Sequence, residues 1–135
     1  MEQALRAQGI KLTPQRRAIL AVLANSEHFT VEEIYERVKK REKNRRTNLA
    51  TVYRNLHLLH DLNLLRRLDI GDGRSRYEGN LEHHHHLICL DCGQVEDLFY
   101  CPLQPDASGL QETGFIISHH TFAAYGHCKH CNNGK

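Results

Sequence analysis

Apolar side chains recur every three or four residues in four stretches of the amino-terminal half, and this spacing predicts four helices. The first helix covers residues 2–8 and ends at Gly9, because glycine suits the C-terminus of a helix. The second begins with Thr13 as its N-cap and Pro14 at its first position. Its apolar face extends to about residue 25.

The third and fourth helices have boundaries that can be read in the same way. Residues 30–33 (TVEE) fit a capping box, and apolar positions follow at helical spacing until a run of charges at residues 39–46. The fourth helix spans about residues 49–62. Its buried face is predicted to hold Val52, Leu56 and Leu59.

A β-hairpin is predicted next. Residues 64–70 and 75–78 flank Gly71-Asp72-Gly73, where glycine supplies the positive φ of a tight turn. Helices followed by a hairpin are the element order of a winged helix-turn-helix. Residues 78–82 (EGNLE) are the best candidate for a hinge.

The pattern changes in the remaining residues, where short strands replace the succession of helices. Residues 87–90 and 95–99 predict short strands, 102–112 a helix, and 114–125 a longer strand. We therefore predict an α+β protein, in which a winged helix-turn-helix precedes a small α/β domain. The predicted boundaries are 1–77, 78–82 for the hinge, and 83–135.

The two parts carry opposite charge. Residues 1–77 hold 16 Lys and Arg against 9 Asp and Glu, whereas residues 78–135 hold 2 against 7. A basic part suits nucleic acid and an acidic, His/Cys-rich part suits cations, although two solvated surfaces would show the same pattern. No apolar run reaches the ~20 residues of a membrane span, and the N-terminus has no signal-like apolar region, so we expect a cytoplasmic protein.

Five cysteines, an odd number, with no secretory signal argue against a disulfide scaffold. Two CxxC motifs, Cys89–Cys92 and Cys128–Cys131, match the four-thiolate preference of structural zinc better than a redox motif. Such a closed site supports folding rather than catalysis. Cys101 is left over, and a small buried side chain is its simplest interpretation.

Four consecutive histidines, residues 83–86, lie inside the chain. In an extended segment alternate side chains face opposite ways, so His83 and His85 share one face, and His84 and His86 share the other. Each pair is half of a metal site that ligands from elsewhere must complete, unless the run is a solvated loop. The candidate ligands are His28, Glu78, Glu96, Asp97, His119 and His120.

Four segments run through nearly the whole chain: LTPQR at 12–16, LATVYRNL at 49–56, HHHHLICLDCG at 83–93 and YGHCKHC at 125–131. In this combination the sequence resembles the ferric uptake regulator (Fur) superfamily of metal-sensing bacterial transcription factors. The resemblance implies a winged helix, an α/β dimerisation domain and a homodimer. It also implies metal-dependent binding to an AT-rich inverted repeat in promoter DNA.

The resemblance further implies roles for particular residues. DNA contacts would come from Lys11, Thr51, Tyr53 and Arg54. Tyr53 would reach a base or a thymine methyl group, and Arg54 would reach a base edge or a phosphate. Structural zinc, one per subunit, would be held by Cys89, Cys92, Cys128 and Cys131. A sensory site would comprise His28, Glu78, His84, His86 and Asp97. A further site would comprise His83, His85 and His120, to which we add Cys101 as a candidate.

Departures from the family pattern bear on the regulatory metal. The further site has His85 where the family often has Asp and Gln104 where it often has Glu, and softer donors favour Zn²⁺ over Fe²⁺. Cys101-Pro102 resembles a segment of zinc-responsive (Zur) members. Glu78 and Asp97 keep the sensory site oxygen-rich, as in iron-responsive members, whereas peroxide sensors (PerR) typically carry Asp at the position of Glu78.

We therefore expect a metal-dependent transcriptional repressor, with zinc favoured and an iron(II)- or peroxide-responsive regulator as the alternative. An enzyme is a rival class, but the sequence has no HExxH or deaminase motif, so we expect no catalytic residues. A metal-storage protein would explain the histidines and cysteines but not the basic amino-terminal part.

Overall fold

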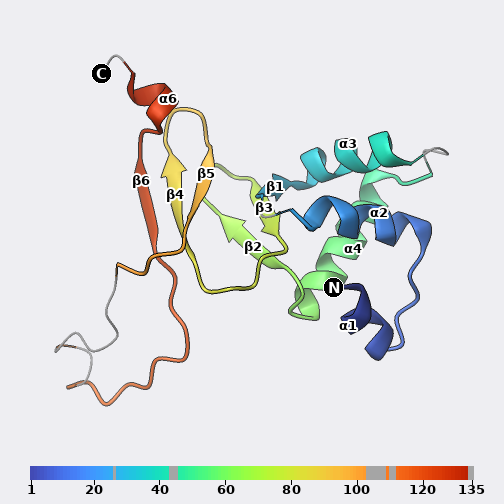
Figure 1. The fold of residues 1–135 in the computed structure, drawn as a ribbon, viewed down its shortest axis with the longest axis horizontal. Helices are drawn as coiled ribbons and strands as arrows, with labels where there is room; N and C mark the ends of the chain where they lie inside the picture. Colours follow the sequence, from blue (N-terminus) through green and yellow to red (C-terminus); the bar gives the residue numbers. More distant parts are fainter. Residues whose placement is uncertain (26, 43–45, 103–108, 110–111, 134–135) are drawn as a thin grey trace. The chain divides into compact units, whose positions relative to one another are not determined.

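The computed structural model describes residues 1–25, 27–42, 46–102, 109 and 112–133. The chain divides into two compact units, Met1–Leu81 and Glu82–Lys135 (Figure 1). Each combines helix and sheet, which agrees with the predicted α+β class. Among the described residues, no helix has the length and apolarity needed to cross a bilayer.

Four helices build most of the first unit: α1 (Glu2–Ala7), α2 (Pro14–Leu23), α3 (Val31–Arg41) and α4 (Leu49–Asp61). Their boundaries confirm the four helices expected from the sequence. The Thr13 hydroxyl oxygen accepts a hydrogen bond from the amide of Arg16, and Pro14 is the first residue of α2. At α3 the capping box is complete, because Thr30 and Glu33 each accept from the other's backbone amide.

A small antiparallel sheet completes the first unit. It contains β1 (Phe29–Thr30), β2 (Arg66–Asp69) and β3 (Ser75–Glu78) in the order β1-β3-β2. The turn between β2 and β3 has positive φ at Gly71 and Gly73, as the hairpin prediction requires. Strand β1 was not foreseen, since two residues are too short to show an alternating pattern.

The core of the first unit lies between the helices and this sheet. Val52, Leu56 and Leu59 are fully buried, so α4 presents the face that the sequence predicted. Residue 78 was predicted both as the end of the hairpin strand and as the start of the hinge, and Glu78 is the last residue of β3 and is itself buried.

The second unit is built on a three-stranded sheet: β4 (His85–Cys89), β5 (Val95–Leu98) and β6 (Ala123–Gly126), in the order β5-β4-β6. The central strand β4 pairs antiparallel with β5 and parallel with β6. The short helix α6 (Lys129–Asn132), which was not predicted, follows β6.

The prediction of one long strand over residues 114–125 is wrong. Only Ala123–Gly126 forms a strand, because it pairs with residues 86–89 of β4 and that strand is only five residues long. Phe115 and Ile116, which lie before it, are largely exposed. The predicted helix at 102–112 falls almost wholly outside the described residues.

The capping box at α3 yields a stability prediction. Thr30→Ala removes the hydroxyl that accepts from the amide of Glu33, and loss of such a cap typically costs about 1 kcal/mol. We therefore expect urea denaturation to show a free energy of unfolding lower by about that amount. Thr30→Ser, which keeps the hydroxyl, is the control, and equal stability of the two variants would contradict the capping role.

Candidate metal centres and nucleic-acid interface

Four cysteines from distant parts of the sequence meet at one end of the second sheet. Cys89 ends β4, Cys92 lies in the turn that follows, Cys128 is the N-cap of α6 and Cys131 lies within α6. Their sulfur atoms all lie within 4.8 Å of one another, and 3.8 Å separates Cys92 from Cys128. Tetrahedral zinc with bonds of about 2.3 Å places its sulfurs about 3.8 Å apart. The four thiols therefore fit one zinc ion.

The ionisation of these thiols also suits a cation. The backbone amide of Cys128 donates to the Cys89 sulfur at 3.3 Å and, with the amide of Cys92, lowers the pKa of Cys89 to about 6. Hydrogen bonding of Cys131 to Cys128 has the opposite effect and raises the pKa of Cys131 to about 12. Four neighbouring thiolates need a positive charge between them, and Zn²⁺ supplies it.

One interaction beside the cysteines was missed by the sequence analysis. His127 Nδ1 lies 2.8 Å from a carboxylate oxygen of Asp91, so it ties the turn after β4 to the segment before α6. Each residue lies next to a cysteine of a different CxxC motif. The pair therefore helps to hold the two motifs at one place.

The alternation predicted for the histidine run is present in β4 and in the two residues that precede it. The rings of His84 and His86 lie 4.8 Å apart, and β5 brings Asp97 opposite His86. His84 Nδ1 donates to the carbonyl of Glu82 at 2.7 Å, and its Nε2 lies 3.7 Å from a carboxylate oxygen of Asp97. A histidine oriented in this way by a backbone carbonyl is prepared to bind a metal through Nε2.

The first unit holds another imidazole–carboxylate pair. Phe29 lies opposite Tyr77 in the β1–β3 ladder, so His28 and Glu78 are brought together across the two strands. His28 Nε2 and a Glu78 carboxylate oxygen are 2.7 Å apart, and the two side chains are only 4% and 1% exposed. Burial of both groups at this distance makes the pair a candidate half of a metal site.

On the opposite face of β4, His83 and His85 gather with His120 and Cys101. Ring centroids of His83 and His85 lie 4.7 Å apart, and those of His83 and His120 lie 4.8 Å apart. Cys101 Sγ is 3.1 Å from His120 Nε2. One ligand atom from each residue lies within 4.8 Å of all the others. The cluster is thus a three-imidazole, one-thiol donor set.

His85 is the buried centre of that cluster. Burial, together with the neighbouring His83 and His120, lowers its pKa, so the ring is neutral as a metal ligand must be. The amide of Phe122 donates to its Nδ1, and its buried Nε2 has no hydrogen-bond partner among the described residues.

Two of the sequence candidates lie outside all of these clusters. The exposed carboxylate of Glu96 accepts from Gln94, and His119 is exposed beside Ser118. Gln104 lies outside the described residues.

The polar side of α4 is exposed as the sequence predicted. Asn48 caps the helix, accepting from both the amide and the hydroxyl of Thr51. Arg54 donates to the same hydroxyl at 3.3 Å, and Tyr53 is 40% exposed. Thr51 thus helps to fix the start of the helix and the direction of Arg54.

A partly buried network links α4 to the loop before α2. Asn55, on α4, accepts from Arg16 Nε at 2.8 Å and donates to the carbonyl of Thr51. Arg16 also donates to the backbone carbonyl of Lys11, whose side chain is exposed. Arg16 therefore connects α4 to the loop that carries Lys11, and both carry residues predicted to contact DNA.

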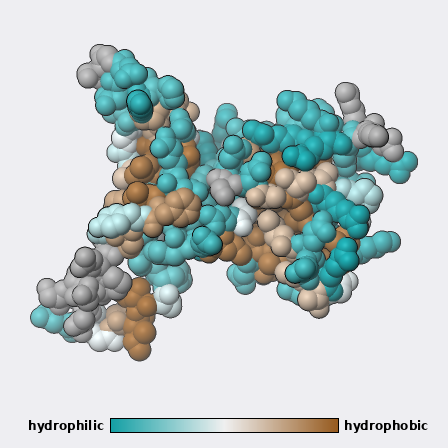
Figure 2. Space-filling model, viewed as in Figure 1, coloured by the Kyte–Doolittle hydropathy of each residue, from teal (hydrophilic) through white to brown (hydrophobic). Residues whose placement is uncertain are grey.

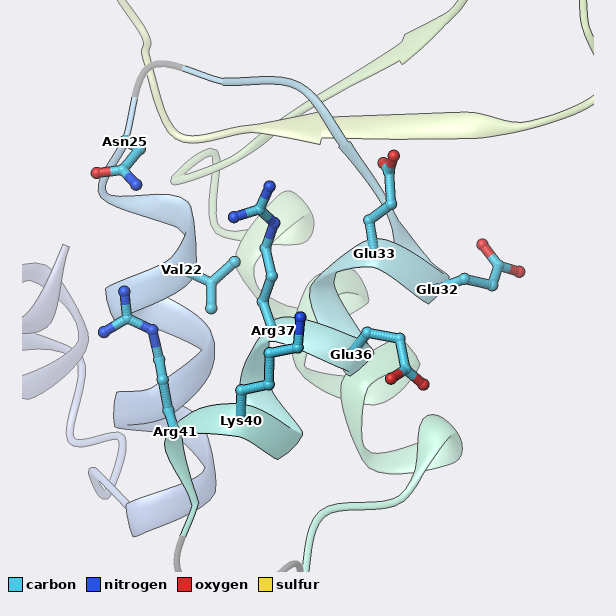
Figure 3. A pocket seen from close by; sticks show the side chains of 8 residues that line it. All are labelled: Val22, Asn25, Glu32, Glu33, Glu36, Arg37, Lys40 and Arg41. Atoms are coloured by element: carbon cyan, nitrogen blue, oxygen red, sulfur yellow. The ribbon is translucent and has the colours of Figure 1, made fainter.

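A hollow of about 620 Å³ opens between α2 and α3. In Figure 3, Arg37 points into the space between the helices, whereas Glu32 and Glu36 point away from α2. Arg37 stacks over the Phe29 ring at 4.2 Å, and Glu36 pairs with Lys39. These contacts give the side chains structural roles, so we assign no ligand to the hollow.

Comparisons with known proteins agree with this combination of features. The model of the "Ferric uptake regulator family" matches residues 7–125. The peroxide-responsive repressor PerR of Staphylococcus aureus is 38% identical over 131 residues, covering 96% of this chain and 87% of that protein. A solved zinc-bound manganese uptake regulator is 36% identical with a TM-score of 0.71, covering 94% of this chain and 97% of its own. The solved ferric uptake regulator of Helicobacter pylori is described as having three functional metal-binding sites. It is 27% identical with a TM-score of 0.73, and the match covers 96% of this chain and 87% of that chain.

The four-cysteine cluster yields a prediction about metal content. We expect Cys92→Ser to lose one zinc per subunit and to destabilise the second unit, because metal binding and folding are coupled at such sites. Zinc analysis after EDTA dialysis, with a thermal melt, measures both. Gln94→Ala changes an exposed side chain in the same turn and should keep its zinc. Retention of zinc and stability by Cys92→Ser would contradict the assignment.

Proposed function

The chain belongs to the ferric uptake regulator family and is a metal-dependent transcriptional regulator, and from that premise we propose that it represses metal-homeostasis genes. Regulators of this family bind promoter DNA as dimers with metal effectors. The observation that carries the proposal is the presence of metal-ligand sets in a chain that also has an exposed polar face on α4. We assign it no catalytic role, and we place it in the cytoplasm with the promoters it reads.

We propose that α4 is the recognition helix. Its exposed face carries Tyr53 and Arg54, and Arg16 ties this helix to the loop that holds Lys11. Tyr53 and Arg54 would reach base edges, whereas Lys11 would reach the DNA backbone or the minor groove. An AT-rich inverted repeat is the operator that suits a two-fold symmetric dimer.

We propose that two copies of the chain associate through the second unit. Figure 2 shows apolar surface over this unit. Scattered exposed apolar residues are common, but here several large ones fall in 54 residues, which favours burial against another chain. These residues are Leu90, Phe99, Tyr100, Phe115, Ile116 and Tyr125.

The activating metal is proposed to take its ligands from both units. His28 and Glu78 form one half of the set in the first unit, and the second unit supplies the other half. That second half consists of His84, His86 and Asp97. Metal bound to ligands of both units would favour one arrangement of the chain, and the DNA affinity of that arrangement would then depend on metal.

Zinc is our preferred regulatory metal. Imidazoles are the majority of the sensory donors, and the separate cluster of His83, His85, Cys101 and His120 adds a thiolate to three imidazoles. Thiolate and imidazole donors suit Zn²⁺, whereas carboxylates suit harder cations. A specific observation also favours a second candidate. Glu78 and Asp97 are oxygen donors, and the S. aureus relative is a peroxide-responsive repressor, so an Fe²⁺-loaded peroxide sensor is the alternative.

Substitutions in the sensory set test this proposal. Glu78→Ala and His86→Ala should each raise by at least about tenfold the free metal needed for DNA binding, because loss of even an outer-shell partner of a metal ligand costs about that much. The four-cysteine zinc should stay in place. Fluorescence anisotropy of a promoter duplex under buffered free Zn²⁺, Fe²⁺ or Mn²⁺ measures the effect.

His60→Ala is the control, since His60 is an exposed histidine beside Asp61 at the end of α4. Unchanged metal dependence in both sensory variants would contradict the ligand assignment. Activation by Fe²⁺ but not by Zn²⁺, with loss of DNA binding after peroxide, would replace zinc with the alternative.

DNA recognition gives a separate prediction. A base contact by Arg54 is worth about 1–3 kcal/mol, so Arg54→Ala should weaken specific binding roughly tenfold or more. Binding to a random duplex should change less. Anisotropy with both duplexes, together with a thermal melt, distinguishes a lost base contact from lost stability. Equal affinities of Arg54→Ala and the unaltered protein for the operator would show that Arg54 does not read it.

A further inference from the structure

A polar notch lies between α4 and the β2–β3 hairpin. It has a volume of about 230 Å³ and lies wholly within the first unit. Tyr53 and His57 line it from α4, and Arg67, Arg74 and Ser75 line it from the hairpin. We call this feature the wing notch.

The strand register explains why these side chains share one face. Arg67 lies opposite Tyr77 in the β2–β3 ladder, and Ser75 is two residues from Tyr77, so the three project to the same side. Arg67 Nε donates to the Ser75 hydroxyl at 2.8 Å. That contact aims the guanidinium along the hairpin and fixes one edge of the notch.

The charges of the notch are not balanced within it. Among the residues that the structure describes, neither Arg67 nor Arg74 has a salt-bridge partner, and Glu32 is the one carboxylate that lines the notch. Arg76 differs from both, because its guanidinium binds both carboxylate oxygens of Asp72, at 3.1 and 2.8 Å. Arg76 lies opposite Leu68, next to the Arg67–Tyr77 pair in the ladder, so its side chain belongs to the other face of the hairpin.

The ligand that fits is an anion small enough to enter between a helix and a hairpin and rich in acceptor oxygens. Two guanidinium groups and a hydroxyl offer several donors, and planar guanidinium suits phosphate oxygens. Tyr53 lines the same notch and also lies on the exposed face of α4, so the anion would lie beside the bases that α4 reads. A backbone phosphate flanking the major groove is such an anion.

We propose that the wing notch binds a phosphodiester group of the DNA backbone, with Arg67 and Arg74 neutralising its charge and thereby setting the position of α4 in the groove. The inference rests on the proposed role of α4. It adds a contact that is independent of base sequence, because a phosphate is present at every step of the duplex.

The test measures affinity for operator and random duplexes at several salt concentrations in the metal-loaded, full-length protein. Arg67→Gln should weaken both duplexes by a similar factor, several-fold at about 0.15 M salt. It should also reduce the slope of log K against log salt by about 0.9, the value for one phosphate contact. Arg67→Lys keeps the charge and should restore most of the slope.

Arg76→Gln is the matched control, since it removes one positive charge from the same hairpin but from the side paired with Asp72. A purely long-range effect of charge would reduce the slope equally in Arg67→Gln and Arg76→Gln, and that result would overturn the proposal. An unchanged slope in Arg67→Gln with a normal thermal melt would overturn it as well.

Free phosphate is the other source of the same chemistry. Replacing chloride by inorganic phosphate at constant ionic strength should not abolish DNA binding if the notch is built for a duplex. If phosphate competes with DNA in the unaltered protein but not in Arg67→Gln, while the salt slopes of the two are equal, the notch is a free-anion site and the proposal is wrong. If the unaltered protein binds no duplex at any metal level, the proposed role of α4 in DNA recognition is wrong. That result differs from the outcomes that contradict the wing notch alone, in which the unaltered protein still binds DNA.

Discussion

The alternation of side chains along β4 is the constraint on which the metal chemistry of this protein depends. A strand turns successive residues to opposite faces, so one uninterrupted histidine run supplies two different donor sets. His84 and His86 lie with Asp97, whereas His83 and His85 lie with His120 and Cys101. The same strand ends at Cys89, which belongs to the four-cysteine cluster. One five-residue strand therefore contributes to all three clusters of candidate ligands, and a change in its register would disturb each of them.

Ladder register has the same importance in the first unit. Pairing of β1 with β3 brings His28 next to Glu78, although the two residues are far apart in the sequence. Pairing of β3 with β2 separates Arg67, which faces the wing notch, from Arg76, which is neutralised by Asp72. Both functions of the protein, binding metal and binding DNA, thus depend on two small sheets rather than on the helical core alone.

Much of this could be predicted from the sequence because the signals are local. Thr30 with Glu33, Thr13 with Pro14 and the Gly71–Gly73 turn fix element ends by nearby hydrogen bonds and backbone preferences. The CxxC spacing and the histidine alternation are local signals as well, and the four-thiolate preference of zinc predicted that the two distant CxxC motifs would meet. Strand β1, the Arg16–Asn55 bond and the Asp91–His127 pair could not be predicted, since each joins residues far apart in the chain. The long strand was overpredicted because an apolar pattern does not reveal how long its partner strand is.

The most direct test of the central claim counts exchangeable metal sites. Protein that keeps zinc in its four-cysteine cluster should bind two Co²⁺ per subunit, and thiolate-to-cobalt charge-transfer absorption should accompany the site that contains Cys101. His84→Ala should lose the site without that absorption, and His85→Ala should lose the site with it. If either substitution abolishes both sites together, or if only one Co²⁺ binds, the two faces of β4 do not hold separate metals and the account is contradicted.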